Sequence, residues 1–286
     1  MAGRHRRRPC GHKPLVVVDV DPVSRVGYRR GENVGWSMKS ARGAVLFLTA
    51  TAAATIATPS HAQRGGEGFL FHVPIVSWSV RGGFDRAFAS SDVFSFVTDE
   101  LTLKRSDFSS ATFGSNIAIR VSQTNDIVLD VSWSGVNRRS EMRHWVDQND
   151  LPIEQTTSLR RIPVTVGIRH YLSSRGRSIG RFAWIPAART TYVGVSAGMM
   201  HYRFHQIGDF VDPQSLNVFP DEFTSKAWTK VLSALAGGEL ALGRAIAVNG
   251  ELRYTWAKGP LSLDFDRFNR IDLSGLSATM GLAFRL

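Results

Sequence analysis

The last residues of the chain alternate strictly between apolar side chains and polar or small ones, and this period of two restricts the fold more than any other feature. It is typical of a β-strand with two different faces, because successive strand side chains point to opposite sides of a sheet. A helix would repeat its apolar residues every three to four positions. The apolar face of this segment consists of Leu276, Ala278, Met280, Leu282, Phe284 and Leu286.

Seven further segments of the chain show the same alternation of apolar residues with small or charged ones. Segments of this kind, separated by polar connections, predict an all-β protein. Their even number favours an eight-stranded antiparallel up-and-down β-barrel, in which each strand pairs with its neighbours in the chain and the last strand pairs with the first. The eight segments cover residues 78–85, 113–122, 127–134, 162–169, 193–199, 232–242, 246–256 and 276–286.

The polar face of these strands carries five positive and four negative residues, whose charges nearly cancel. A soluble barrel would expose this face to water. A transmembrane barrel would turn it into the lumen and present the apolar face to lipid. We expect the second arrangement, and within it a lumen charge network with a structural role. Its members are Arg81, Asp85, Arg120, Asp130, Arg169, Glu239, Glu251, Arg253 and Arg285.

Connections between the predicted strands alternate in length, which favours the transmembrane barrel. Long extracellular loops and short periplasmic turns are typical of such barrels. Residues 173–189 break the alternation, and the sequence leaves open whether they form a turn or a small periplasmic element. The long connections are expected over about residues 89–110, 136–159, 205–226 and 258–270, and the tight ones at Thr124-Asn125 and Gly243-Arg244.

Aromatic residues gather on the apolar face next to the long connections. Tryptophan and related side chains prefer the membrane–water interface, where an apolar ring can carry a polar edge. The pattern therefore predicts an outer aromatic girdle. Its members are Phe84, Phe113, Trp133, Trp228 and Trp256.

The net charge of +11 belongs mainly to the N-terminal part of the chain. The first 62 residues hold ten Lys/Arg against three Asp/Glu, a net charge of +7, which leaves only +4 for the rest. A basic protein of this charge could bind nucleic acid, but the main domain lacks that charge, so we expect no nucleic-acid partner. The single cysteine, Cys10, excludes disulfide scaffolds and cysteine-based metal sites.

Residues 38–62 have the three parts of a signal peptide. Lys39 and Arg42 precede a mildly apolar stretch, and Ser60-His61-Ala62 resembles a cleavage site. We expect residues 1–37 to be a misassigned N-terminal extension, with translation starting at Met38, or a basic arm. Residues 63–74 would then form a short periplasmic segment, and residues 75–286 the outer-membrane barrel.

The segment from Gly275 to Leu286 resembles the C-terminal targeting strand of bacterial outer-membrane proteins, with Met280, Leu282, Phe284 and Leu286 on its apolar face. Together with the eight strands, residues 75–286 resemble the small eight-stranded outer-membrane barrels of the OmpA/OmpX type. The resemblance implies location in the bacterial outer membrane, contact with its lipid and lipopolysaccharide, insertion by the barrel-assembly machinery, and a monomer.

Nothing in the sequence indicates catalysis, a metal site or a cofactor. His144, His201 and His205 lie near the loop ends of strands, but none is paired at a fixed spacing with a serine. The basic stretch from Arg138 to His144 is expected to be an exposed loop that could contact lipopolysaccharide. We expect a non-enzymatic structural or surface-interacting protein. A narrow conduit for small solutes and a soluble periplasmic lipocalin-like barrel remain alternatives.

Overall fold

The computed structural model of the chain describes residues 70–180, 182–212, 215 and 217–286. The predicted signal peptide at 38–62, the extension at 1–37 with Cys10, and most of the segment 63–74 lie outside these residues. The start of translation at Met38 therefore stays a prediction.

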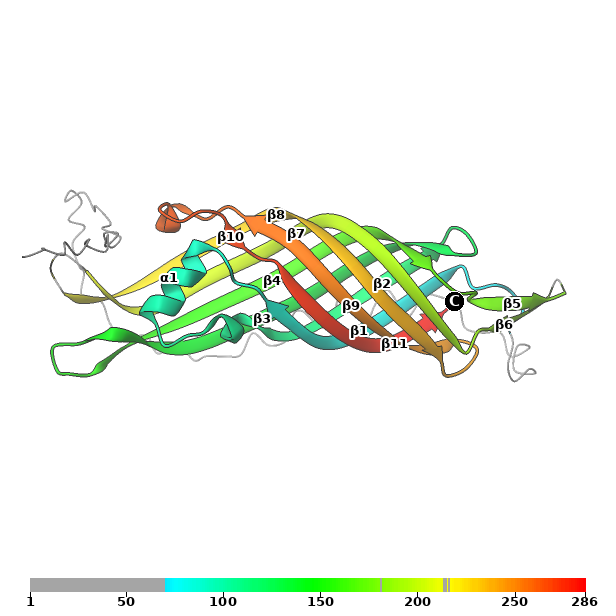
Figure 1. The fold of residues 1–286 in the computed structure, drawn as a ribbon, viewed down its shortest axis with the longest axis horizontal. Helices are drawn as coiled ribbons and strands as arrows, with labels where there is room; N and C mark the ends of the chain where they lie inside the picture. The colour runs from blue at the N-terminus through cyan, green and yellow to red at the C-terminus, as the bar shows by residue number, and fades with distance from the viewer. Residues whose placement is uncertain (1–69, 181, 213–214, 216) are drawn as a thin grey trace, which may run out of the picture. The chain divides into compact units, whose positions relative to one another are not determined.

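Eight strands form one closed antiparallel ring, which confirms the predicted fold class (Figure 1). Each strand pairs with the next one along the ring, and β1 pairs with β11 over its whole length, which closes the sheet. Each of the eight predicted segments coincides with a ring strand, and three of them run one or two residues past the strand end. These strands are β1 (Val76–Ala87), β2 (Ser110–Arg120), β3 (Asn125–Val146), β4 (Pro152–Tyr171), β7 (Arg189–Val211), β8 (Val218–Ala241), β9 (Ile246–Gly259) and β11 (Gly275–Arg285).

The apolar face of the ring points outward. Val164, Leu240 and Leu282 are 38%, 58% and 41% exposed, whereas Asp130 and Glu251 are buried inside. A soluble barrel would show the opposite pattern, because apolar surface in water costs about 25 cal/mol per Å². Where the eight strands run side by side, each is paired on both edges, as the hydrocarbon core of a membrane requires. The barrel is therefore built to contact lipid.

Two of the predicted long loops are wrong. Residues 136–159 and 205–226 are mostly strand: β3 runs to Val146 and β4 begins at Pro152, while β7 runs to Val211 and β8 begins at Val218. The basic stretch 138–144 accordingly lies in β3 and not in a loop. The apolar alternation stops there because the outward face of these strand ends leaves the apolar band, although the backbone pairing continues.

The open question of residues 173–189 is settled by a small hairpin, formed by β5 (Gly176–Ile179) and β6 (Ala183–Pro186). It lies at the end of the barrel that also holds the short turns. Trp184 of β6 exchanges backbone hydrogen bonds with Leu70, each 2.8 Å long. Within the described part of the chain, no helix has the length and apolar character needed to cross a membrane.

The wall of the barrel is uneven in height. The four strands β3, β4, β7 and β8 have 20 to 24 residues, whereas β1, β2, β9 and β11 have 11 to 14. At about 3.3 Å per residue, the long strands extend well beyond the short ones. Two loops follow short strands at the end of the barrel where the long strands project (Figure 1). Loop 88–109 contains α1 (Asp92–Glu100) and η2 (Arg105–Phe108), and loop 260–274 contains η3 (Leu263–Phe265) and β10 (Ile271–Asp272).

Candidate functional site: a filled lumen and a capped mouth

Buried ion pairs fill the interior of the ring. Seven of the nine residues predicted as lumen charges form one continuous chain of contacts, in which each charge meets one of the opposite sign. The order of this chain is Arg81, Asp130, Arg253, Glu251, Arg169, Glu239 and Arg285.

The centre of this chain is held by two carboxylates. Asp130 of β3 accepts hydrogen bonds from Arg81 and, at 2.9 Å, from Arg253. Arg253 also donates to Glu251 at 2.8 and 3.1 Å. These side chains come from β1, β3 and β9, which are not all neighbours in the ring, so the contacts run across the lumen. Charges of this kind remain stable out of water only when they are paired and hydrogen-bonded.

The chain continues toward the short turns. Arg169 lies 3.4 Å from Glu251 and 3.9 Å from Glu239, and Arg285 lies 3.2 Å from Glu239. The guanidinium of Arg169 also lies over the ring of Tyr192, 4.2 Å from its centre, in a cation–π contact. The lumen is thus crossed by aromatic rings as well as by charges.

Two of the nine predicted charges lie outside the chain. Asp85 pairs with Arg161 at 2.8 Å, and Arg161 also donates to the carbonyl oxygen of Leu273 at 3.1 Å. Arg120 donates to the carbonyl oxygen of Ser122 at 3.2 Å. Among the described residues Arg120 forms no salt bridge, so no ion pair joins it to the predicted network.

Several further charged and polar groups line the lumen and were not predicted from the sequence. Asp126 pairs with Arg175 at 2.6 Å, and Tyr171 donates a hydrogen bond to Glu239 at 3.0 Å. Asp126 lies just before segment 127–134, and Tyr171 lies just after segment 162–169. Both continue the alternation of the predicted inward charges, so extending each segment by one or two residues could have found them. Arg175 lies beyond a strand end, where no period indicates its direction.

Among the described residues, two small voids in the barrel have volumes of about 10 and 30 Å³. One lies between Arg120, Glu239 and Arg285 and the other between Asp85, Arg161 and Arg253. Each has room for about one water molecule, so neither can hold a ligand or pass a hydrated solute.

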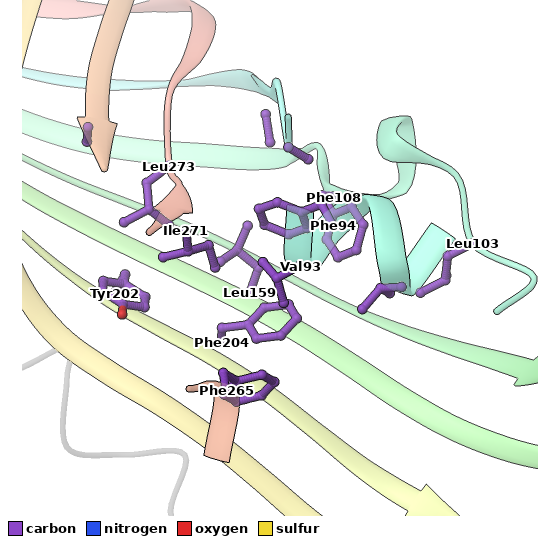
Figure 2. Close-up of a cluster of buried hydrophobic side chains, with 14 of the residues drawn as sticks. Val93, Phe94, Leu103, Phe108, Leu159, Tyr202, Phe204, Phe265, Ile271 and Leu273 are labelled. Atoms are coloured by element: carbon purple, nitrogen blue, oxygen red, sulfur yellow. The ribbon is translucent and has the colours of Figure 1, made fainter. Parts of the chain in front are cut away.

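Beyond the ion pairs, toward the loop end, the inward face of the long strands carries a cluster of buried apolar side chains. Leu159 of β4 and Met200, Tyr202 and Phe204 of β7 are buried there, and α1 packs onto them (Figure 2). The remaining buried members of this apolar cap are Ala87, Ala89, Val93, Phe94, Val97, Leu101, Leu103, Phe108, Val231, Ala257, Phe265, Ile271 and Leu273.

Ring contacts hold the apolar cap together. Phe94 of α1 meets Phe108 edge-on at 4.7 Å and Phe204 at 5.6 Å, and Phe204 meets Phe265 of η3 at 5.5 Å (Figure 2). Edge-to-face pairs contribute about 0.5–1.5 kcal/mol each beyond their buried area. One face of α1 and the 3₁₀ turn η3 therefore complete a hydrophobic core with the tall strands, and this core closes the mouth of the barrel.

The two capping loops are fastened to each other by polar contacts. The Asp272 carboxylate accepts hydrogen bonds from the backbone N–H and the hydroxyl of Ser90 and from the backbone N–H of Ser274. On α1, the Asp92 carboxylate accepts two from Asn269, at 2.7 and 2.9 Å. Burial by itself would raise the pKa of Asp272, but the bonds from Ser90 and Ser274 leave it below its ordinary value of 3.8.

Asp272→Asn should loosen the loop at residues 88–109. The NH2 group of the new amide must face either the two donors of Ser90 or the backbone N–H of Ser274. Either loss should cost about 1–2 kcal/mol of local stability and speed amide exchange in α1 about tenfold. Because the pKa of the Asp272 carboxyl is lower in the folded state than in the unfolded state, its ionisation stabilises the folded loop above the unfolded pKa. This stabilisation is lost as the pH falls through the folded pKa. The wild-type loop should therefore loosen only in acid below about pH 3.8.

Hydrogen exchange followed by mass spectrometry at neutral and acid pH would measure both effects. Asp266→Asn is the matched control, because Asp266 is an exposed residue of loop 260–274, which also contains Asp272. It should leave exchange in α1 unchanged. Equal exchange in α1 for the wild type and Asp272→Asn at neutral pH would contradict the fastening role.

The five residues predicted as an aromatic girdle all lie on the outer face, with exposed fractions between 40 and 59%. Phe113 and Trp133 face each other on β2 and β3 and stack at 6.4 Å. Trp228 of β8 lies beside His201 of β7, 5.2 Å away. On the C-terminal strand, Met280, Leu282 and Leu286 are exposed, and Phe284 stacks on Trp78 of β1 at 5.4 Å. The role of these residues at the membrane interface stays a prediction.

The histidines near the loop end show no catalytic arrangement. His205 contacts Glu222 at 3.0 Å on the exposed outer face, and His201 lies against a tryptophan ring. In the described ranges, no serine hydroxyl completes a Ser–His–acid triad with either of them.

A closed eight-stranded ring with an apolar outside, paired charges inside and long loops at one end defines a class of protein. The chain folds as a small eight-stranded antiparallel β-barrel of the transmembrane type, with its apolar face outward.

Comparisons with solved structures match the chain, at low identity, to proteins that include the following three. Neisserial surface protein A matches with 10% identity and a TM-score of 0.39, over 77% of this chain and 100% of its own. OprG of Pseudomonas aeruginosa matches with 12% identity and a TM-score of 0.41, over 76% of this chain and 99% of its own. Ail of Yersinia pestis matches with 10% identity and a TM-score of 0.36, over 77% and 100%. No protein-family model and no curated protein matches the chain.

Proposed function

We propose that this protein is a non-conducting, non-enzymatic barrel that anchors a rigid wall of strands at the cell surface and acts there as a structural or surface-interacting protein. One observation supports this above all others. The barrel is closed twice along its length, by the chain of ion pairs from Arg81 to Arg285 and by the apolar cap under α1. An eight-stranded ring is already so narrow that side chains fill it.

The alternatives fit the geometry less well. A solute conduit needs a continuous passage, whereas the two voids here hold about one water molecule each. A lipocalin-like binding barrel needs a ligand cavity inside and a polar surface outside, whereas here the outer surface is apolar. We also propose that residues 38–62 direct export and that the barrel-assembly machinery inserts the chain as a monomer, with β11 as its targeting strand.

The full chain, reconstituted into planar bilayers, should show no ionic conductance. Removing the loop cap alone should leave conductance absent, because the ion-pair chain still blocks the lumen. Conductance should appear only when the loop cap is removed and Arg81, Asp130, Glu251 and Arg253 are also all serine, since this variant lacks both closures. Its folded state is checked by heat-modifiable migration on a gel.

Steady conductance by the wild-type chain would overturn the proposal in favour of the conduit. The matched control replaces four exposed charges at the loop end, Asp99, Glu154, Asp266 and Arg270, with serine. This control should not conduct.

A further inference from the structure

The outer wall of the barrel carries a row of positive charges just beyond the girdle. Arg160 of β4, Arg203 of β7 and Lys226 of β8 are exposed and lie directly opposite one another in register across three adjacent strands. Adjacent strands are about 4.8 Å apart, so three cations share a width of about 10 Å. Like charges facing each other across strands are destabilising, and such a row is stable only with an anion beside it.

Apolar and aromatic residues border this row on its membrane side. Two residues further along the same strands, Ile162, His201 and Trp228 occupy the corresponding positions, and Trp228 is 56% exposed. Two residues along a strand span about 7 Å. Aromatic side chains prefer the interface between hydrocarbon and headgroups, and the loop end of such a barrel faces outward from the cell. The basic row therefore lies at the level of the headgroups of the outer leaflet.

Two further lysines lie near the row, Lys258 on the loop side of Trp256 and Lys230 on the membrane side of Trp228. Lys230 follows Trp228 on the same outward face of β8, and Lys258 adjoins Trp256 on β9, beside the pairing of Val231 with Ala257. We call Arg160, Arg203, Lys226, Lys230 and Lys258 the outer basic patch. One carboxylate lies near it: Glu222 is 4.0 Å from Arg203 and is also bound by His205 at 3.0 Å. Among the residues that the structure describes, Arg160, Lys226, Lys230 and Lys258 have no salt-bridge partner.

We propose that the outer basic patch binds the phosphate groups of an anionic outer-leaflet lipid, lipopolysaccharide, whose acyl chains lie on the adjoining apolar wall. Clustered cations above an apolar, aromatic surface match a molecule with phosphates above acyl chains. Arginine and lysine form charge-assisted hydrogen bonds with phosphate oxygens. The proposal depends on the location in the outer membrane and not on the closed lumen. It also moves lipid contact from the predicted loop at residues 138–144 to the wall formed by β4, β7, β8 and β9.

Native mass spectrometry of the full chain refolded in lipopolysaccharide-free detergent would test this site, with bisphosphorylated lipid A as the probe. Each cation near such a surface contributes about a fivefold change in affinity. The triple variant Arg160→Gln, Lys226→Gln and Lys230→Gln should therefore bind lipid A roughly a hundredfold more weakly. A charge-conserving triple, Arg160→Lys, Lys226→Arg and Lys230→Arg, should retain binding, which separates charge from folding.

The matched control removes three exposed arginines elsewhere, as Arg177→Gln, Arg189→Gln and Arg270→Gln, and should bind lipid A like the wild type. Lipid A without phosphates should bind the wild type as weakly as bisphosphorylated lipid A binds the glutamine triple. Unchanged binding by the glutamine triple, or equal binding of the phosphate-free lipid by the wild type, would overturn the proposal. So would inorganic phosphate binding as tightly as lipid A, because it would identify the ligand as a soluble anion.

Discussion

Asp130→Asn should lower the free energy of unfolding of the barrel by about 3–5 kcal/mol, the usual cost of removing one partner from a buried ion pair. Asp130 is 2% exposed and accepts hydrogen bonds from both Arg81 and Arg253. Arg253 keeps Glu251 as a second partner, but Arg81 has no other salt bridge among the described residues. The substitution therefore leaves a buried guanidinium without a counter-charge, and urea unfolding followed by tryptophan fluorescence would measure the loss.

A double-mutant cycle separates the lost pair from a general disturbance of the lumen. Adding Arg81→Met to Asp130→Asn removes the stranded charge, so the double variant should be more stable than Asp130→Asn alone. Asp99→Asn, at an exposed carboxylate on α1, is the matched control and should change stability by less than about 0.5 kcal/mol. An Asp130→Asn barrel as stable as the control would show that the ion-pair chain does not support the fold.

Gly281→Ala should impair closure of the ring. Gly281 lies on β11 at the seam with β1, and a Cβ atom there would stand 2.0 Å from the carbonyl oxygen of Val80 and 2.7 Å from the Cα of Arg81. A Cβ atom added at Gly83, on the opposite side of the same seam, would stand equally close to the carbonyl oxygen of Ala278. Backbone atoms cannot move aside without loss of strand pairing, so a cost of roughly 3 kcal/mol or more is expected.

Heat-modifiable migration and urea unfolding would report this loss as a smaller folded fraction and a lower midpoint. Gly250→Ala in the neighbouring strand β9 is the matched control, since a Cβ at that position meets no atom within 4 Å. If Gly281→Ala folds and unfolds like Gly250→Ala, the seam tolerates side chains, and glycine is not needed for closure.

The parts of the fold that follow from local pattern were predictable. The alternation in segments such as 162–169 and 276–286 indicated both the strands and the side of each that faces lipid. The prediction failed where the strands leave the membrane: at residues 136–159 and 205–226 the outward side chains are no longer apolar, so β3, β4, β7 and β8 continue without their signal. The apolar cap was also not predicted, because α1 has only nine residues and the partners of its apolar face, such as Leu159 and Phe204, are distant in the chain.

The amino-acid pattern alone was enough to predict the number of strands, the barrel class and most of the charged residues that face the lumen. The reason is that lipid outside requires apolar side chains, whereas the narrow space inside accepts polar ones, at alternate positions of each strand. The partners of those charges depend on the closed ring. Asp130 meets Arg253, far away in the chain, and Arg161 meets Asp85, because register and closure bring β3 opposite β9 and β4 opposite β1. The same holds for the outer basic patch, whose cations become neighbours through strand pairing, a non-local property that a linear pattern does not contain.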